Sequence, residues 1–142
     1  MAVVIAKPTG RPDGVRWALD GDLASLGVLR LQLRSYLTSQ AVAVTVAGDV
    51  VLAVQEAAKN AVRASSGRTV SVAVWIERDA IWVCVRDAGK GFAYRGSRRC
   101  PSPWSTHGRG LCLMNALMDE VTVKRSRGTR VVMHRRLATA AA

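Results

Sequence analysis

Two hydrophobic periodicities alternate along the chain, and the switches between them predict its elements. From Leu23 to Leu37, leucines recur every three or four residues, which predicts an amphipathic helix with Asp22 as its N-cap. A second helix is predicted over residues 47–64, where valines and alanines form one apolar face. Strict alternation follows and predicts two paired strands, over residues 69–76 and 80–86.

The remaining elements are shorter. They are a strand at 16–20, a helix at 109–118 and two strands at 120–124 and 129–136. This order of elements predicts an α+β fold, with helices packed on one face of a mixed, mostly antiparallel sheet. We expect one domain over residues 15–137, preceded by a flexible N-terminal arm (1–14) and followed by a short tail (138–142).

Composition supports a globular chain with a large positive charge. Hydrophobic residues make up 49% of the 142 residues, which is enough for a core that needs no disulfide bond or metal to stabilise it. The net charge of +11 points to nucleic acid or to an acidic partner. Arginine outnumbers lysine 17 to 4 and is mostly scattered, so biased composition explains much of the charge and nucleic acid is the less favoured partner.

Cysteine usage and hydropathy bear on the compartment. No run of about 18 apolar residues exists, so no transmembrane helix is expected. The odd number of cysteines, with no secretory signal, indicates a reducing cytoplasm. Cys84 and Cys112 fall on apolar patterns and are expected to be core thiols.

Glu56 and Asn60 lie four residues apart and therefore share one face of the second helix. The amide oxygen of Asn60 is a ligand type that magnesium accepts, with waters and phosphates completing the shell. One turn away, Glu56 can act as a general base toward a water or a hydroxyl. The alternative is a solvated helix face that carries an ordinary polar pair.

Asp87 ends an apolar strand and is followed by glycines at 89 and 91. A carboxylate in that place can accept a hydrogen bond from an exocyclic amine such as that of adenine. Gly89 and Gly91 would let the backbone approach a ring closely. The alternative is a simple turn after a strand.

Gly108 and Gly110 precede the third helix, where backbone amides and the helix dipole favour phosphate. Arg109 would add positive charge, although an ordinary glycine-rich helix start explains the same residues. Thr129 can either bond a nucleobase or pair within its strand. The irregular stretch before the helix is long enough to be a functional lid or a disordered segment.

Taken in order, these segments resemble the Bergerat-fold ATPases and kinases, a group that includes DNA gyrase B, MutL and the histidine kinases. Glu56 with Asn60 resembles their N box, and the stretch from Asp87 to Gly91 resembles their G1 box. The G2 box is matched by Gly108-Arg109-Gly110-Leu111, and Gly128-Thr129 is similar to a late Gly-Thr element. The likeness covers about Val15 to Leu137 and is greatest to the small anti-sigma-factor serine kinases.

That resemblance implies a Bergerat-type two-layer sandwich and a set of roles. It implies that ATP and Mg are the cofactors, with Asn60 holding the metal and Glu56 activating the attacking hydroxyl. The implied nucleotide-binding residues are Asn60, Asp87, Gly89, Gly91, Gly108, Arg109, Gly110, Leu111 and Thr129, with residues 92–107 as the ATP lid. Ala64 departs from a histidine that many relatives carry after the N box.

The resemblance further implies a cytoplasmic protein serine/threonine kinase that is also an anti-sigma factor. Its partners would be a sigma factor and an anti-sigma-factor antagonist protein, with a homodimer as an inherited expectation. The chain carries no phosphoacceptor-histidine helix, which argues against a complete histidine kinase. A non-kinase module, in which ATP only orders the lid, is the main alternative, and a DNA-linked ATPase is suggested by charge alone.

Overall fold

The structure, a computed structural model, describes residues 4–8, 14–88, 109–125 and 127–137. These residues form three helices and a six-stranded sheet. Their bounds in chain order are β1 (Val4–Pro8), β2 (Val15–Leu19), α1 (Ser25–Ser39), α2 (Val44–Ala64), β3 (Val70–Glu77), β4 (Ala80–Asp87), α3 (Arg109–Leu117), β5 (Glu120–Arg125) and β6 (Thr129–Arg136).

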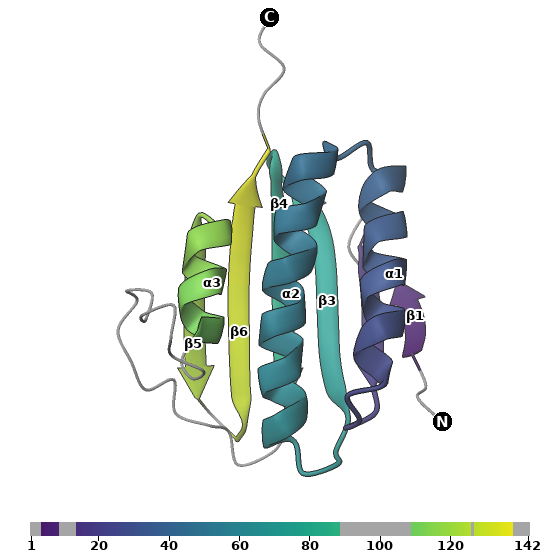
Figure 1. The fold of residues 1–142 in the computed structure, drawn as a ribbon, viewed down its shortest axis with the longest axis vertical. Coiled ribbons are helices and arrows are strands. Elements are labelled where there is room, and N and C mark those ends of the chain that lie inside the picture. Colours follow the sequence, from purple (N-terminus) through teal and green to yellow (C-terminus); the bar gives the residue numbers. More distant parts are fainter. Residues whose placement is uncertain (1–3, 9–13, 89–108, 126, 138–142) are drawn as a thin grey trace, which may run out of the picture.

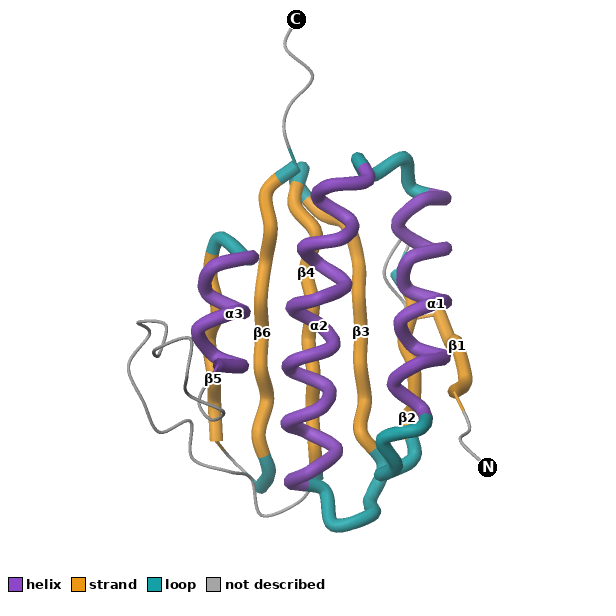
Figure 2. Tube along the Cα trace, viewed as in Figure 1, coloured by secondary structure: helices purple, strands orange, loops and turns teal. Residues whose placement is uncertain are grey.

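The sheet has the strand order β1-β2-β3-β4-β6-β5, and every pairing between described strands is antiparallel. The predicted α+β fold class is therefore confirmed, without the parallel pairing that a mixed sheet would contain among these strands. All three helices cover one face of the sheet, as Figures 1 and 2 show. The result is a two-layer sandwich with one covered and one open sheet face.

The prediction of a flexible arm over residues 1–14 is wrong for Val4–Pro8. This segment forms β1 and pairs with β2 along its whole length. The prolines and glycines of the arm suggested a loop, but an apolar run can still pair with the free edge of β2. Pro8 stands at the end of this edge strand, where a missing N–H costs little.

Two helix starts differ from the prediction. Helix α1 begins at Ser25, and Asp22 accepts a hydrogen bond from the Ala24 amide at 2.8 Å without capping the helix. Asp22 therefore closes the turn that precedes α1. Helix α2 begins at Val44, three residues before the predicted start. β-branched residues at the beginning of α2 are weak helix formers, and for that reason the sequence predicted a connecting segment there.

The core lies between the helices and the covered sheet face. Leucines of α1 and valines and alanines of α2 pack on alternate residues of the strands. The fully buried positions include Trp17, Leu29, Leu33, Val54, Val72, Ile81 and Met133. The predicted apolar faces of both helices are therefore the ones that are buried.

A tight turn between β3 and β4 sets the register of the central strands. Arg78 and Asp79 both have positive φ, 52° and 58°, as a two-residue type I′ turn requires. From this turn the ladder runs without a bulge until Asp87 stands opposite Val70 on one side and Thr129 on the other. The turn thus places Asp87 at the far end of the sheet with its side chain on the covered face.

Four chain segments meet at that end of the molecule. The C-terminal half of α2, the start of α3, the end of β4 and the start of β6 all lie near the lower edge in Figure 1. Within the described part of the chain, none of the helices has the length and apolarity needed to cross a membrane.

The two cysteines expected to be core thiols have different outcomes. Cys84 is a thiol, although it is only partly buried. Cys112 is buried but disulfide-bonded, so the expectation of a thiol at this position is wrong. The prediction of a buried position on α3 is confirmed, whereas a disulfide bond leaves no mark on local periodicity.

Candidate nucleotide site

Glu56 and Asn60 are both half-buried on α2, on the side that faces the start of α3. Gly110, in the first turn of α3, lies against both side chains. A methyl group at position 110 would stand 2.9 Å from Asn60 Nδ2 and 3.5 Å from Glu56 Oε2. The absent side chain of Gly110 therefore lets α3 approach these two polar groups closely.

Lys59 is a neighbour of Glu56 that the motif reading did not single out. Its Nζ lies 3.2 Å from each carboxylate oxygen of Glu56, one helical turn away. The Glu56 side chain is 15% exposed and that of Lys59 is 36% exposed. The Lys59 end of the pair is open to solvent, so the ion pair contributes little to stability and Lys59 can exchange Glu56 for another partner. The three-residue spacing on a helix was the signal that could have found Lys59.

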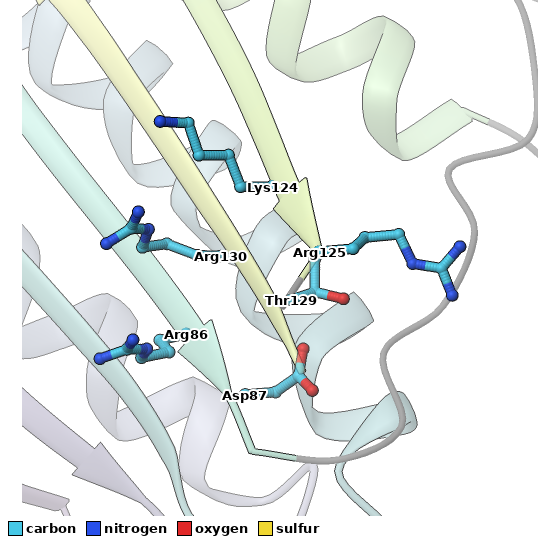
Figure 3. A pocket seen from close by; sticks show the side chains of 6 residues that line it. All are labelled: Arg86, Asp87, Lys124, Arg125, Thr129 and Arg130. Carbon is cyan, nitrogen blue, oxygen red and sulfur yellow. The ribbon is translucent and has the colours of Figure 1, made fainter. Parts of the chain in front are cut away.

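Asp87 and Thr129 form the second cluster, at the ends of β4 and β6. They are direct cross-strand neighbours and are 2% and 3% exposed. Figure 3 shows the carboxylate and the hydroxyl next to each other at the end of the sheet. The register of the β4–β6 pair thus brings together two polar groups from separate motifs.

The hydroxyl of Thr129 has no hydrogen-bond partner among the described residues, although its oxygen is buried. A buried polar group left without a partner costs about 1–3 kcal/mol. Native structures tolerate few such groups, and each calls for an explanation. A ligand that offers a donor or an acceptor at this point would remove the penalty.

Gly128 fits closely against the strand end that carries Asp87. Its φ is +115°, and a methyl group there would overlap the carbonyl oxygen of Asp87. Only glycine allows this conformation and this approach without strain. The Gly-Thr element therefore has two roles. Gly128 allows the turn before β6 to approach the Asp87 carbonyl, and Thr129, the next residue, lies opposite Asp87.

A cavity of about 400 Å³ opens at this end of the sheet. Besides Asp87 and Thr129, its walls are the four cationic residues Arg86, Lys124, Arg125 and Arg130. In Figure 3, Arg125 extends to the side opposite from Arg86 and Arg130. The buried carboxylate and hydroxyl offer hydrogen-bond partners for a polar ring on the covered side of this cavity, near Arg125. Arg86, Lys124 and Arg130 line its other side, on the uncovered face of the sheet.

The remaining predicted site residues divide into two groups. Gly89, Gly91, Gly108 and the lid at 92–107 lie outside the described residues, as does the side chain of Arg109, the first residue of α3. Leu111 is described and is partly buried against the core. Its carbonyl accepts a hydrogen bond from Asn115 Nδ2 at 2.9 Å, so Leu111 helps to anchor the first turns of α3.

A protein-only metal cage is not found in the described ranges, where no group of three or more His, Cys, Asp or Glu side chains converges. Magnesium bound with nucleotides commonly uses few protein ligands and keeps several waters. Asn60 carries an amide oxygen of the kind that such a site uses, and its Nδ2 is the atom nearest to the position of a methyl group on Gly110.

Arg135 is a structural contact that the sequence did not reveal. Its Nη1 donates to Asp49 Oδ2 at 3.0 Å and to the carbonyl of Leu117 at 2.6 Å. These bonds tie the C-terminal end of α3 to β6 and to the first half of α2. The opposite end of α3 carries Gly110, so Arg135 helps to fix the helix that lies against Glu56 and Asn60.

Comparison with known proteins identifies the family of this chain and two of its relatives. Residues 19–135 match the histidine kinase-like ATPase domain. The chain is 30% identical to the serine-protein kinase RsbW of Bacillus pumilus (strain SAFR-032) and 31% identical to that of Bacillus licheniformis. Each alignment covers 76% of this chain and 76% of the relative.

A solved structure shares the fold. The RsbU and RsbW domains of a Mycobacterium tuberculosis protein align with a TM-score of 0.70 and 23% identity, over 90% of this chain. The chain spans only 33% of the length of that structure. On the family match and the two RsbW relatives, the chain belongs to the histidine kinase-like ATPase domain family.

Proposed function

We propose that this protein binds ATP with magnesium and transfers the terminal phosphoryl group to a serine of an anti-sigma-factor antagonist, while also acting as an anti-sigma factor. The observation that carries nucleotide binding is the buried Thr129 hydroxyl, without a partner among the described residues, beside the buried Asp87. The relatives named serine-protein kinase RsbW support the choice of reaction.

Asp87 and Thr129 would read the nucleobase. The Asp87 carboxylate accepts a hydrogen bond from the exocyclic amine of adenine, and a guanine would present a carbonyl at the same place. The Thr129 hydroxyl, which has no partner among the described residues, would bond a ring nitrogen directly or through water. Both groups are buried, so the hydrogen bonds would form away from competing water.

Asn60 and the start of α3 would hold the phosphates. The amide oxygen of Asn60 would be the protein ligand of Mg²⁺, which supplies charge neutralisation at the transferred phosphoryl group when it is bound. Backbone amides at the start of a helix favour anionic oxygen. Gly110 keeps this helix start close to Asn60.

Glu56 would act on the serine hydroxyl. As the hydroxyl oxygen bonds to phosphorus, its proton passes to the Glu56 carboxylate and ADP departs with the electron pair of the broken P–O bond. The ion pair with Lys59 keeps the carboxylate in place until a substrate hydroxyl arrives. Phosphoryl transfer needs mainly positioning and charge stabilisation, so this small set of residues suffices.

The test is phosphoryl transfer from γ-labelled ATP to the antagonists encoded in the same organism. We expect labelling with wild type and a loss of about 10²–10⁴-fold in the Glu56→Gln variant. ATP affinity, measured by calorimetry on the same samples, should stay within a few-fold of wild type. Glu77→Gln, an exposed carboxylate on β3, is the matched control and should transfer normally.

Undiminished transfer by Glu56→Gln would remove Glu56 as the base. Absence of transfer by wild type to any antagonist, together with tight ATP binding, would favour the non-kinase binding module. Absence of ATP binding by wild type would reject both functions.

A further inference from the structure

The uncovered face of the sheet carries a row of cations. Arg86 on β4 stands opposite Arg130 on β6, and Arg130 stands opposite Lys124 on β5. Figure 3 shows the three side chains extending to the same side from neighbouring strands. We refer to Arg86, Arg130 and Lys124 as the basic row.

No described residue neutralises the positive charges of the basic row. None of its three side chains forms a hydrogen bond or an ion pair with another described residue. Like charges directly opposite each other destabilise a sheet. Arg135, in contrast, is paired with Asp49 on the covered side. The basic row therefore lowers the stability of the isolated fold, which is typical of residues kept for a ligand.

A hollow adjoins the basic row on the same face. It has a volume of about 330 Å³ and is bounded by Arg16, Arg86, Arg130 and Trp75. Small side chains complete the lining, namely Ser71, Ala73 and Cys84. A carboxylate entering this hollow would meet three guanidinium groups, which bind carboxylates strongly and in a directed way.

The charge pattern along the strands limits what the face can bind. Trp82 lies four residues before Arg86 on β4. Its ring centroid is 6.3 Å from that of Trp75 and 4.7 Å from that of His134. Carboxylates flank this aromatic group, since Glu77 accepts a hydrogen bond from Trp75 Nε1 at 3.3 Å and Glu120 lies 3.8 Å from His134. A phosphate backbone running along the face would meet these carboxylates.

The positive area is also short. With neighbouring strands about 4.8 Å apart, the basic row extends over roughly 10 Å. This length matches a few carboxylates on an extended peptide, and a nucleic-acid strand would need a longer cationic track. We propose that the open sheet face docks an acidic extended segment of a partner protein, with its carboxylates on the basic row and in the adjoining hollow.

The probe is a fluorescein-labelled oligoglutamate peptide, titrated at low salt and followed by anisotropy. Arg130→Glu is the informative variant because it places a carboxylate between Arg86 and Lys124. We expect affinity for the peptide to fall about tenfold. The midpoint of thermal unfolding should equal or exceed that of wild type, since like-charge pairs are replaced by opposite ones. Lost folding therefore cannot account for the lost binding.

Arg30→Glu on α1 is the matched control. It makes the same change in net charge on an exposed residue of the helix layer, and peptide affinity should stay within about twofold of wild type. An equal loss in both variants would show that only net charge matters and would overturn the proposal. Undiminished binding by Arg130→Glu would do the same.

Two further outcomes would also overturn it. Oligothymidylate of equal charge that binds more tightly than oligoglutamate, and loses affinity with Arg130→Glu, would assign the face to nucleic acid. Sedimentation that shows a dimer in wild type and a monomer in Arg130→Glu would assign it to a second copy of this chain. Tighter binding of oligoglutamate to a monomer supports the docking site.

Discussion

The two halves of the site are built differently. Asp87 and Thr129 lie on paired strand ends, are almost fully buried and are placed by sheet register. Glu56 and Asn60 lie half-buried on a helix, and their surroundings depend on how closely α3 approaches. The strand half resembles a preformed recognition site, whereas the helix half can change its contacts. Recognition of a base and chemistry on a phosphate should therefore be separable by mutation.

The largest effect is expected in the strand half. Asp87→Asn presents an amide where a carboxylate accepts a hydrogen bond, and the loss of a bond to a charged group should lower ATP affinity by about 10–100-fold. Calorimetry with Mg²⁺ measures the change. Asp79→Asn is the control, because Asp79 is exposed in the β3–β4 turn and asparagine tolerates its positive φ. Equal ATP affinity of Asp87→Asn and wild type would contradict the placement of the adenine ring beside Asp87.

A smaller effect is expected in the helix half from Gly110→Ala. The added methyl would stand 2.9 Å from Asn60 Nδ2, so the Asn60 side chain must move. Because disturbance around a metal ligand costs about 10–100-fold in metal affinity, ATP binding with Mg²⁺ should weaken by about tenfold. Binding without Mg²⁺ should change little, which distinguishes the two halves.

The control for that variant is Gly27→Ala on α1, where nothing lies within 4 Å of the added methyl. It should bind ATP as wild type does. An equal loss with and without Mg²⁺ in Gly110→Ala would mean that Asn60 does not set the metal contribution.

Arg135 tests how far the helix half depends on distant contacts. Arg135→Met removes the bonds to Asp49 and to the carbonyl of Leu117, and should lower the free energy of unfolding by about 1–2 kcal/mol. Denaturant unfolding measures it, with Arg136→Met as an exposed neighbouring control. A loss of Mg²⁺-dependent ATP affinity beyond that of the control would show that the far end of α3 positions Gly110. Unchanged stability would mean that α3 is held without these bonds.

The same contrast explains what the sequence could predict. Periodicity identified α2, and with it the shared face of Glu56 and Asn60, because both properties depend on local spacing. It also placed Asp87 at a strand end. The approach of Gly110 to Asn60 joins residues 50 positions apart, and no local pattern encodes it. Val4–Pro8 becomes a strand by pairing with the free edge of β2, which is a long-range contact. The local sequence shows only the prolines and glycines nearby, and these predicted a loop.

Thr129 offers the smallest effect and the most specific one. Thr129→Val keeps the shape of the side chain and removes the buried hydroxyl that lacks a partner among the described residues. The stability of the ligand-free protein should therefore stay equal or rise by up to about 1 kcal/mol. ATP affinity should fall by about fivefold, the value of one neutral hydrogen bond. Denaturant unfolding and calorimetry on the same variant give both numbers, and Thr122→Val, at an exposed position of β5, is the control.

The two measurements separate the possible roles of this hydroxyl. A ligand-binding hydroxyl predicts opposite signs for the changes in stability and affinity, whereas a hydroxyl that only supports the fold predicts a loss of stability. A less stable Thr129→Val with wild-type affinity would thus remove Thr129 from the nucleotide site. Base recognition in the strand half would then depend on Asp87, whose burial and position at the end of β4 do not require the threonine hydroxyl.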